Sequence, residues 1–442
     1  MTIPEDSMNR TPTIDQREVK VLFVVFKAMR GGHVLSALSI ARQLRKRGVT
    51  PVFAGADGEL ATEIGQEMGF EEVQIPIYHG TRNTYFTWAS LAAVKRLSNL
   101  IRQHNIDLVH AFDARSYMHA YPASLMANVP VVCTLCGGVD PYYNLPDAPN
   151  LIVFSEEQKM RMVNHFRWNA DAVTVMRSRL DTKEILNTQF ASEDAEARLV
   201  TQNQHAFTIM MISSFDSSKI DSIHSVLDAI EKLLKEGLNI QLVMIGGKGD
   251  LYQQAKLRGE SIGEQFPASK MLFTGPAAKA FRYLRYADLV LGVGRSAFEG
   301  MALGRPTIVV GKNGFAGVVE ADQVSDLAWY NFSGRNVDSV QGSHVLASEI
   351  KKLMLNPQRR KEIGEFGKQY IEENIEVSVG VPTTQLVYHQ ILDHHNRLAR
   401  FARSRQWISF LCRLVPVIRD NSIHTIKRFL RMVSTIKQPR KN

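Results

Sequence analysis

Residues 288–311 read DLVLGVGRSAFEGMALGRPTIVVG, and this stretch decides the fold. An apolar run ends in a turn with Gly292 and Gly294, a short helix follows, and a second apolar run starts at Thr307. Ser296 belongs to the residue types that cap the start of a helix. Glycines let a ligand approach the backbone, and the free N–H groups at the positive helix end favour a phosphate. The stretch therefore predicts two strands of an open α/β sheet, with an anion-binding turn at Gly294–Ser296.

Two side chains of this stretch extend the prediction from an anion to a nucleotide. Arg295 carries a guanidinium that could bind a phosphate bidentately. Glu299, one helical turn further on, could accept hydrogen bonds from the hydroxyls of a ribose beside that phosphate. The alternative is a capped helix with a solvated Glu299, and local chemistry alone does not separate the two interpretations.

The same alternation of apolar strands and amphipathic helices continues in both directions. Strands are predicted at 20–26, 51–54, 73–77, 107–112, 129–134, 151–155 and 172–176, and again at 207–212, 240–245, 271–273, 288–293 and 307–310. Such alternation predicts an α/β protein made of two Rossmann-like, doubly wound domains that face a cleft. The expected organisation is a leader at 1–18, an N-terminal domain at 19–188, a polar linker at 189–204, a C-terminal domain at 205–380, a helix at 381–400 and a basic tail at 401–442.

Length and composition exclude several classes of protein. The chain has 442 residues, 45% apolar and 22% charged, which is typical of a globular protein with two or three domains and unlike collagen or a disordered chain. No apolar run approaches the roughly 20 residues of a spanning helix. The first 18 residues contain Glu5, Asp6 and Asp15 and no apolar segment, so no signal peptide is predicted. Three cysteines cannot form a disulfide framework, which points to the cytoplasm.

The positive charge is concentrated at the C-terminal end. Residues 397–442 contain twelve Lys and Arg against the single Asp420, a net charge of +11, whereas the whole chain carries +9. The globular part is therefore close to neutral, and the basic character does not predict a body that binds nucleic acid.

Two short segments of the tail are amphipathic. The first places Phe401, Trp407, Ile408, Leu411 and Leu414 on one helical face, and the second places Ile423, Ile426, Leu430 and Val433 on another. Basic amphipathic helices lie in the headgroup plane of anionic membranes, so we expect 401–442 to dock on such a surface. The alternatives are a helical pair packed on the body or a solvated basic end; RNA binding is less favoured, because Trp407 alone offers a stacking platform.

Other candidate motifs are weak. The turn at 26–33 lacks the G-x-G-x-x-G spacing, and Gly246-Gly-Lys-Gly249 matches no phosphate-binding loop, which favours a left-handed turn into a helix. Cys133 and Cys136 have C-x-x-C spacing, but along a strand residues three apart point to opposite faces. Two buried thiols are therefore predicted, and no metal site.

Five segments together carry a resemblance to a known family. They are IDLVHAF at 106–112, NVPVVCTLCG at 128–137, VMRSRLD at 175–181, MISSFDSSK at 211–219 and FEGMALGRP at 298–306. In order and spacing they resemble the motifs of GT-B glycosyltransferases of the retaining family 4 type, also called group 1, over residues 19–398. The resemblance implies an acceptor-side N-terminal domain and a C-terminal domain that holds a nucleotide-diphosphate sugar.

The resemblance also implies roles for individual residues. Lys219 matches the diphosphate-binding lysine, and Glu299 matches the second Glu of the E-x7-E motif, which binds the nucleotide ribose. Gly31 and Gly32 match the glycine loop that faces the phosphates, and His110 matches the first histidine of its strand motif. A strand-end histidine with satisfied hydrogen bonds is the equally weighted alternative for His110.

Three positions depart from the family pattern. Leu291 stands where the first Glu of E-x7-E is expected, Ser214 replaces the usual diphosphate arginine, and Phe112 replaces a second histidine. We expect Arg295 to compensate for the missing arginine, since it lies on the phosphate-facing turn.

The implied reaction is transfer of a sugar without a metal ion, through an oxocarbenium-like transition state and with retention of configuration. Fixed cations and backbone N–H groups would stabilise the departing diphosphate, and no side-chain base is assigned. The expected acceptor is a lipid-linked or surface-polysaccharide glycan at the inner face of a membrane. A sugar-nucleotide epimerase of the same fold and a pseudoenzyme that only binds a nucleotide sugar remain as alternatives.

Overall fold

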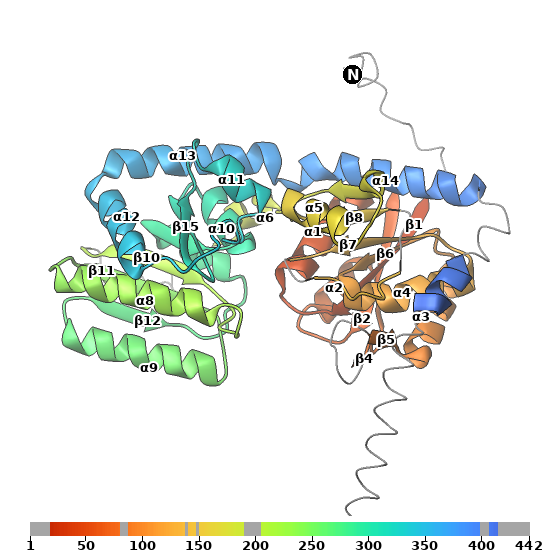
Figure 1. Cartoon of the computed structure of the whole chain (residues 1–442), viewed down its shortest axis with the longest axis horizontal. Helices are drawn as coiled ribbons and strands as arrows, with labels where there is room; N and C mark the ends of the chain where they lie inside the picture. The colour runs from red at the N-terminus through yellow and green to blue at the C-terminus, as the bar shows by residue number, and fades with distance from the viewer. Residues whose placement is uncertain are drawn as a thin grey trace, which may run out of the picture.

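Two α/β domains lie side by side in this computed structural model, which describes residues 18–79, 87–137, 140–146, 150–189, 205–397 and 406–413 (Figure 1). The described strands of the first domain form a parallel sheet in the order β3-β2-β1-β6-β7-β8-β9. Those of the second domain form the sheet β12-β11-β10-β13-β14-β15, in which only β15 is antiparallel. The predicted pair of Rossmann-like domains is confirmed.

The elements of the first half follow one another as strand, helix and strand. In chain order they are β1 (Val19–Lys27), α1 (Gly32–Arg45), β2 (Val49–Ala56), α2 (Ala61–Met68), β3 (Phe70–Glu72), β4 (Ile77–His79), β5 (Thr87–Ala89), α3 (Leu91–Gln103), β6 (Leu108–Phe112), α4 (Ala114–Ala127), β7 (Val131–Leu135), β8 (Leu151–Val153), α5 (Glu156–Asn164), η2 (Ala170–Ala172), β9 (Val173–Val175) and α6 (Thr182–Asn187).

The second half repeats the pattern and ends in four helices. Its elements are β10 (Phe207–Ile212), α8 (Ile220–Lys235), β11 (Ile240–Ile245), α9 (Asp250–Gln265), β12 (Lys270–Phe273), η3 (Ala280–Tyr286), β13 (Leu289–Gly292), α10 (Arg295–Ala302), β14 (Thr307–Gly311), β15 (Gly314–Val318), α11 (Val324–Trp329), α12 (Ser343–Leu355), α13 (Pro357–Asn374) and α14 (Val377–Arg397). None of these helices is long and apolar enough to cross a bilayer, within the residues described.

Strand β1 shows why the parallel sheets form. Its side chains alternate between two buried clusters, with Leu22 and Val24 in one and Val21, Phe23 and Val25 in the other. A strand covered on both faces needs a nearly continuous apolar run, which this sequence provides. The predicted strand at 73–77 is wrong, because β3 ends at Glu72, β4 starts only at Ile77, and residues 73–76 between them belong to no strand.

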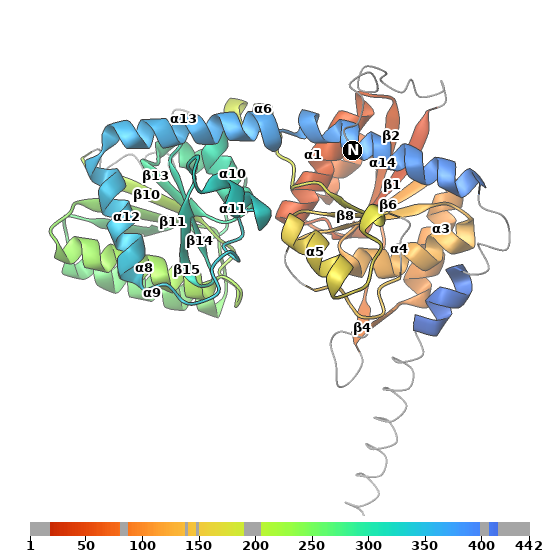
Figure 2. The same ribbon diagram turned by 45° about the horizontal axis from the view of Figure 1, so that its top comes forward.

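The C-terminal helix α14 belongs to the core of the first domain. The chain passes from α13 on the second domain into α14, which returns across the first domain and contacts α1 (Figures 1 and 2). Val381, Tyr388 and Ile391 are buried there. The sequence instead suggested that the second domain extends to 380. Helix α14 begins at Val377, and its buried apolar residues from Val377 onward pack in the core of the first domain.

Helix α6 makes the opposite exchange. Leu180 and Ile185 join a cluster of second-domain residues that includes Phe298 and Phe332. The expected linker at 189–204, apart from Gln189, lies outside the described residues. The expected leader, apart from Glu18, also lies outside the described residues.

Only residues 406–413 of the expected tail are described, and they form one helical segment. Phe410 is buried against the first domain, with its ring centroid 5.8 Å from that of Tyr121, and Trp407 packs beside it. Ile408 and Leu411 are 60% and 56% exposed. Of the residues that the sequence places on one face, Trp407 therefore turns to the first domain together with Phe410, whereas Ile408 and Leu411 face solvent.

Candidate functional site

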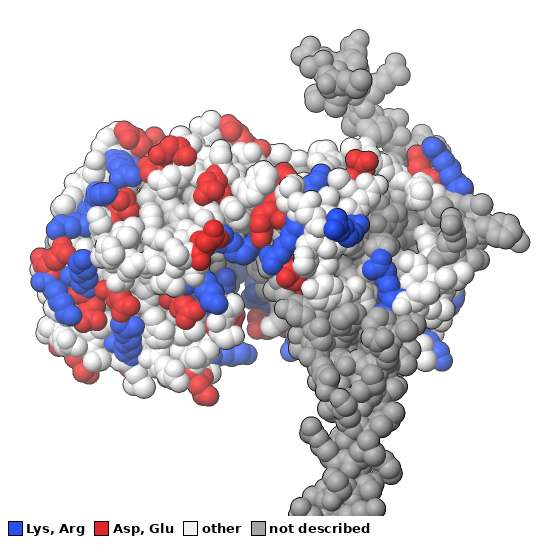
Figure 3. Space-filling view, viewed as in Figure 1, with Lys and Arg blue, Asp and Glu red and all other residues white. Residues whose placement is uncertain are grey.

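A cleft between the two domains gathers residues that follow the carboxyl ends of strands in both sheets. Its volume is about 340 Å³, which is within the range of small-molecule sites. The lining residues are Gly32, His33, Asp113, Cys136, Gly137, Phe154 and Ser178 from the first half of the chain, and Lys219, Val293, Gly294, Arg295, Asn331, Ser333 and Arg335 from the second. Acidic and basic side chains meet where the domains face each other (Figure 3).

The glycine loop of the first domain faces the Gly294 turn of the second. A Cβ atom on Gly32 would stand 3.6 Å from both Cβ and Cδ of Arg295, so the two walls approach closely here. Gly31 caps α1 and is not among the lining residues. Of the two glycines expected in the site, the structure thus places Gly32 in the cleft and Gly31 directly behind it.

The turn before α10 is shaped by Gly294. Gly294 is the N-cap and has φ 50° and ψ −119°, a conformation that favours glycine. Ser296 lies inside the first turn, and its hydroxyl accepts from the Val293 N–H and donates to the Val293 carbonyl, each over 3.1 Å. The prediction that Ser296 is the N-cap is therefore wrong: its side chain folds back on the preceding turn, while only Gly294 can adopt the capping conformation without strain.

Arg295 and Glu299 form a nearly buried ion pair within α10. Arg295 Nε donates to Glu299 Oε1 over 2.9 Å, and Arg295 Nη1 donates to the Arg179 carbonyl over 3.1 Å. Burial raises the pKa of the Glu299 carboxyl, and the charge and hydrogen bond of Arg295 act against that rise. Arg295 lines the cleft, whereas Glu299 lies behind it.

Lys219 is the N-cap residue of α8 and lines the cleft. Burial lowers the pKa of its ammonium group, Asp216 opposes this, and the positive charge of Arg335 lowers the pKa further. Its Nζ atom has no hydrogen-bond or ion-pair partner among the described residues, so a partly buried cation lines the cleft without a counter-charge at contact distance.

His110 lies inside the first domain and does not line the cleft. Its Nδ1 is 2.7 Å from the Tyr388 hydroxyl on α14, and its Nε2 is 2.7 Å from the Thr134 hydroxyl on β7. Complete burial lowers the pKa of His110 to about 3, so the ring is neutral. Phe112 is also buried and stacks on this ring at 4.2 Å. This geometry favours the structural interpretation of His110, in which it joins α14 to the sheet.

Leu291 and Ser214, the other two departures from the family pattern, contribute no charged side chain to the cleft. Leu291 is fully buried in the core of the second domain and offers nothing to the cleft. Ser214 is exposed and donates its hydroxyl hydrogen to Asp216 over 2.5 Å. Neither position supplies the charge that the family pattern places there.

Asp113 and His33 were not predicted from the sequence, and both line the wall on the first domain. Asp113 has φ 75°, caps α4 by accepting from the Ala114 N–H over 2.9 Å, and has a pKa raised by burial. Burial lowers the pKa of His33, partly offset by Asp113. His33 directly follows Gly32, and Asp113 directly follows Phe112. Their position next to these motif residues is the feature of the sequence that could have predicted them.

Asn331 and Arg335 were also missed. They come from the loop between α11 and α12, far along the sequence from every motif, so no local pattern marks them. The described residues contain no cluster of three side chains suited to hold a metal ion. Cys133 and Cys136 are buried in different clusters, and burial raises the pKa of both thiols well above the usual value, as the strand pattern predicts.

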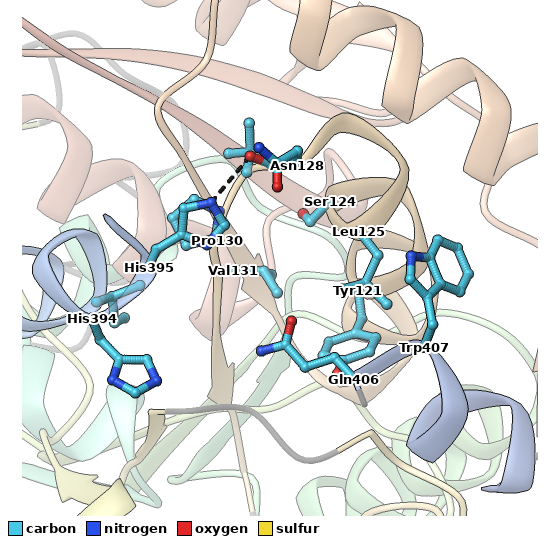
Figure 4. Close-up of a pocket in the computed structure, with 12 residues that line it drawn as sticks. Tyr121, Ser124, Leu125, Asn128, Pro130, Val131, His394, His395, Gln406 and Trp407 are labelled. Atoms are coloured by element: carbon cyan, nitrogen blue, oxygen red, sulfur yellow. Dashed lines mark hydrogen bonds between the residues drawn. The ribbon is translucent and has the colours of Figure 1, made fainter. Parts of the chain in front are cut away.

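A second pocket, shown in Figure 4, lies far from these residues. It is formed by the end of α4, the end of α14 and residues 406–407, and its side chains include Tyr121, Leu125 and Trp407. His395 Nε2 lies 3.1 Å from the Asn128 carbonyl at its edge. Its cavity of about 40 Å³ has room for a few water molecules, not for a nucleotide sugar.

Comparison with known proteins identifies both domains. Residues 30–182 match the family model described as Glycosyltransferase Family 4, and residues 206–355 match that described as Glycosyl transferases group 1. A comparison with curated protein sequences finds no match.

Solved structures share the fold at low sequence identity. A glycosyltransferase from Rickettsia africae is 17% identical with a TM-score of 0.64, covering 85% of this chain and 99% of its own. Anabaena HepE in complex with UDP and glucose is 18% identical with a TM-score of 0.64, covering 84% and 99%. WaaG, a glycosyltransferase involved in lipopolysaccharide biosynthesis, is 14% identical with a TM-score of 0.54, covering 83% and 98%.

The two family models together match more than half of the chain, one on each side of the cleft. The structural neighbours have the same two-domain arrangement over nearly their whole length. The chain therefore belongs to the group 1 glycosyltransferases of the GT-B fold.

Proposed function

We propose that this glycosyltransferase moves a sugar from a nucleoside-diphosphate sugar to a lipid-linked or surface-polysaccharide acceptor. The donor class rests on Lys219, a partly buried cation that has no contacting counter-charge among the described residues and lies in a cleft that also contains the Gly294 turn and Arg295. A diphosphate supplies the missing negative charge. Anabaena HepE, which has the same fold, is described with UDP and glucose, and this supports the donor class.

The chemistry follows from the charge that develops on the leaving group. As the bond between the sugar and the diphosphate breaks, negative charge grows on the departing phosphate oxygen. Fixed cations that are already desolvated stabilise this charge without reorganisation and take the part that a metal ion plays in other transferases. We therefore propose metal-independent transfer; retention at the sugar carbon is what the family resemblance implies, and no side-chain base is assigned.

The acceptor side of the proposal rests on the C-terminal end. Residues 397–442 carry a net charge of +11, and the helical segment at 406–413 presents Ile408 and Leu411 to solvent. A basic segment with exposed apolar side chains suits the inner surface of an anionic membrane, where a lipid-linked acceptor resides. WaaG, described as involved in lipopolysaccharide biosynthesis, has the same fold and supports this class of acceptor.

One assay tests the proposal against its alternatives. The protein is incubated with UDP-, GDP- and ADP-sugars and with membranes as acceptor source, and free nucleotide and membrane-bound sugar are both measured. Transfer releases nucleotide and labels the membrane in equal amounts. Epimerisation changes the sugar while labelling no acceptor, and a pseudoenzyme binds the nucleotide sugar with no turnover; either result contradicts the proposal.

A further inference from the structure

Three Lys and Arg side chains line the cleft in the described part of the chain, and they differ in the hydrogen-bond and ion-pair partners that they already have. Arg295 is engaged by Glu299 and by the Arg179 carbonyl. Lys219 has no contacting partner among the described residues. Arg335 is the third, and its position has no counterpart among the motifs of the sequence. Ser214 stands where the family pattern has its diphosphate arginine, and its hydroxyl donates to Asp216. A second cation beside Lys219 therefore has to come from another part of the chain.

The loop that carries Arg335 is held firmly against the Gly294 turn. The Gly294 N–H donates to the Phe332 carbonyl over 2.7 Å. Asn331, Phe332 and Gly334 have φ of 52°, 54° and 75°, so the backbone turns sharply in the left-handed region. A Cβ on Gly334 would stand 2.4 Å from the Gly311 Cα, which leaves room for glycine only. Arg335 therefore leaves the backbone at a fixed place on the cleft wall.

The guanidinium of Arg335 reaches across the cleft with unused donors. Its Nη2 donates to Glu157 Oε2 over 2.7 Å, and Glu157 lies in the first turn of α5 on the opposite domain. The Arg335 Nε is buried and has no hydrogen-bond partner, and the same holds for Asn331 Oδ1 in the same loop. Buried polar atoms without partners are costly, and since both residues line the cleft, a ligand bound there supplies the hydrogen bonds that these two atoms lack.

We propose that Arg335 is the second diphosphate-binding cation, paired with Lys219, and that Glu157 competes with the diphosphate for it. This inference rests on the proposed function. Both cations line one cleft, and the positive charge of Arg335 acts on Lys219. A guanidinium binds two phosphate oxygens at once, which uses Nε together with one terminal nitrogen. A bound diphosphate satisfies the orphaned Nε and replaces a single carboxylate, so Glu157 is released when the donor enters.

Two variants test the inference, because one is expected to weaken ligand binding and the other to strengthen it. Calorimetric titrations with UDP, and with inorganic pyrophosphate as a probe that lacks base and ribose, are made on the full chain. Arg335→Gln is expected to weaken both by about 10- to 100-fold, the effect of one charge-assisted bond, and Arg335→Lys to retain part of the affinity. Glu157→Gln is expected to tighten both several-fold, because it removes the competing charge. In the Arg335→Gln background, Glu157→Gln should have no effect.

Arg359→Gln is the matched control. Arg359 pairs with Glu320 in the same domain, with side chains 29% and 22% exposed, close to the 31% and 16% of Arg335 and Glu157, but this pair lies away from the cleft. Unchanged affinity in Arg359→Gln and unchanged melting curves in all variants support the inference. It is overturned if Arg335→Gln binds pyrophosphate as well as the wild type, or if Glu157→Gln weakens binding as much as Arg335→Gln does. A wild type that binds none of UDP, GDP, ADP and pyrophosphate overturns the proposed function itself.

Discussion

Arg295 and Glu299 neutralise each other across one turn of α10, with 2.9 Å between Nε and Oε1 and side chains only 15% and 8% exposed. The sequence assigns one of them to a phosphate and the other to a ribose. In the structure each is already the partner of the other. A donor that binds at this helix must therefore share this ion pair or displace one of its members. The role of Glu299 can be tested by comparing a ligand that contains ribose with one that contains only phosphate.

Glu299→Gln should weaken nucleoside-diphosphate binding while sparing pyrophosphate. The substitution keeps the shape of the side chain and removes charge-assisted hydrogen bonds to ribose hydroxyls, worth about 1.5–3 kcal/mol each. Calorimetry with UDP and with pyrophosphate measures both. If the two ligands lose affinity equally, or neither does, Glu299 serves the helix and not the ribose.

Arg295→Ala should reduce the free energy of unfolding by about 3–5 kcal/mol at neutral pH, because it leaves the buried Glu299 carboxylate without its cation. The folded-state pKa of Glu299 is raised, so the carboxyl protonates more readily in the folded than in the unfolded chain. The loss should therefore shrink as the pH falls toward the unfolded pKa and grow as the pH rises. Urea unfolding at several pH values measures this; Arg295→Met with Glu299→Met should restore much of the stability.

Lys219→Ala should weaken UDP and pyrophosphate binding by about 10- to 100-fold, because it removes a partly buried cation from the cleft. The melting temperature should hardly change, since the ammonium has no contacting partner among the described residues. Lys248→Ala is the control, because Lys248 is an exposed lysine in the turn before α9 of the same domain. If Lys219→Ala and Arg295→Ala both bind nucleotide as the wild type does, the diphosphate does not lie at this turn.

His110 should make the protein sensitive to acid. Its folded pKa is about 3, below the unfolded value of 6.5, so the unfolded chain takes up a proton first as the pH falls. Stability from this group is fully present above pH 6.5 and is lost below it, by about 1.4 kcal/mol for each pH unit until the folded pKa is reached. His110→Gln should be less stable at pH 7.5 but lose less between pH 7.5 and 5. Equal losses in both proteins would show that other groups govern the acid response.

Binding to anionic vesicles should depend on the basic end and decrease with salt. The full chain is compared with a chain that ends after Arg413, which keeps the packed segment with Phe410 and removes seven Lys and Arg and Asp420. The shorter chain should sediment less with anionic vesicles, and the difference should disappear near 1 M salt, where the Debye length is about 3 Å. Equal sedimentation of both chains, or no preference over neutral lipid, would contradict the membrane role.

Ile408→Ser with Leu411→Ser tests the exposed apolar edge of the same segment. Both side chains are more than half exposed, so the double variant should weaken vesicle binding without changing the melting temperature. Phe410→Ser is the contrasting control: it should destabilise the first domain, because Phe410 is buried against Tyr121.

The sequence alone determined the two parallel sheets, the place of Lys219 and of the Gly294 turn, and the buried cysteines on opposite faces. These features depend on local patterns: apolar runs of strand length, glycines that follow a strand, and the two-residue period of a strand. The motifs identified the family for the same reason, since each is a short segment whose residues act together.

Tertiary structure decided what depends on contacts between distant residues. It brought Arg335 and Glu157 together from opposite domains, paired Arg295 with Glu299, and buried His110 between Thr134 and Tyr388. It also returned α14 to the first domain and placed Phe410 on the inner face of its segment. The sequence specifies the charge and shape of each side chain. Whether that side chain contacts a ligand, a counter-charge or the core depends on which surfaces bury the most apolar area when the chain folds.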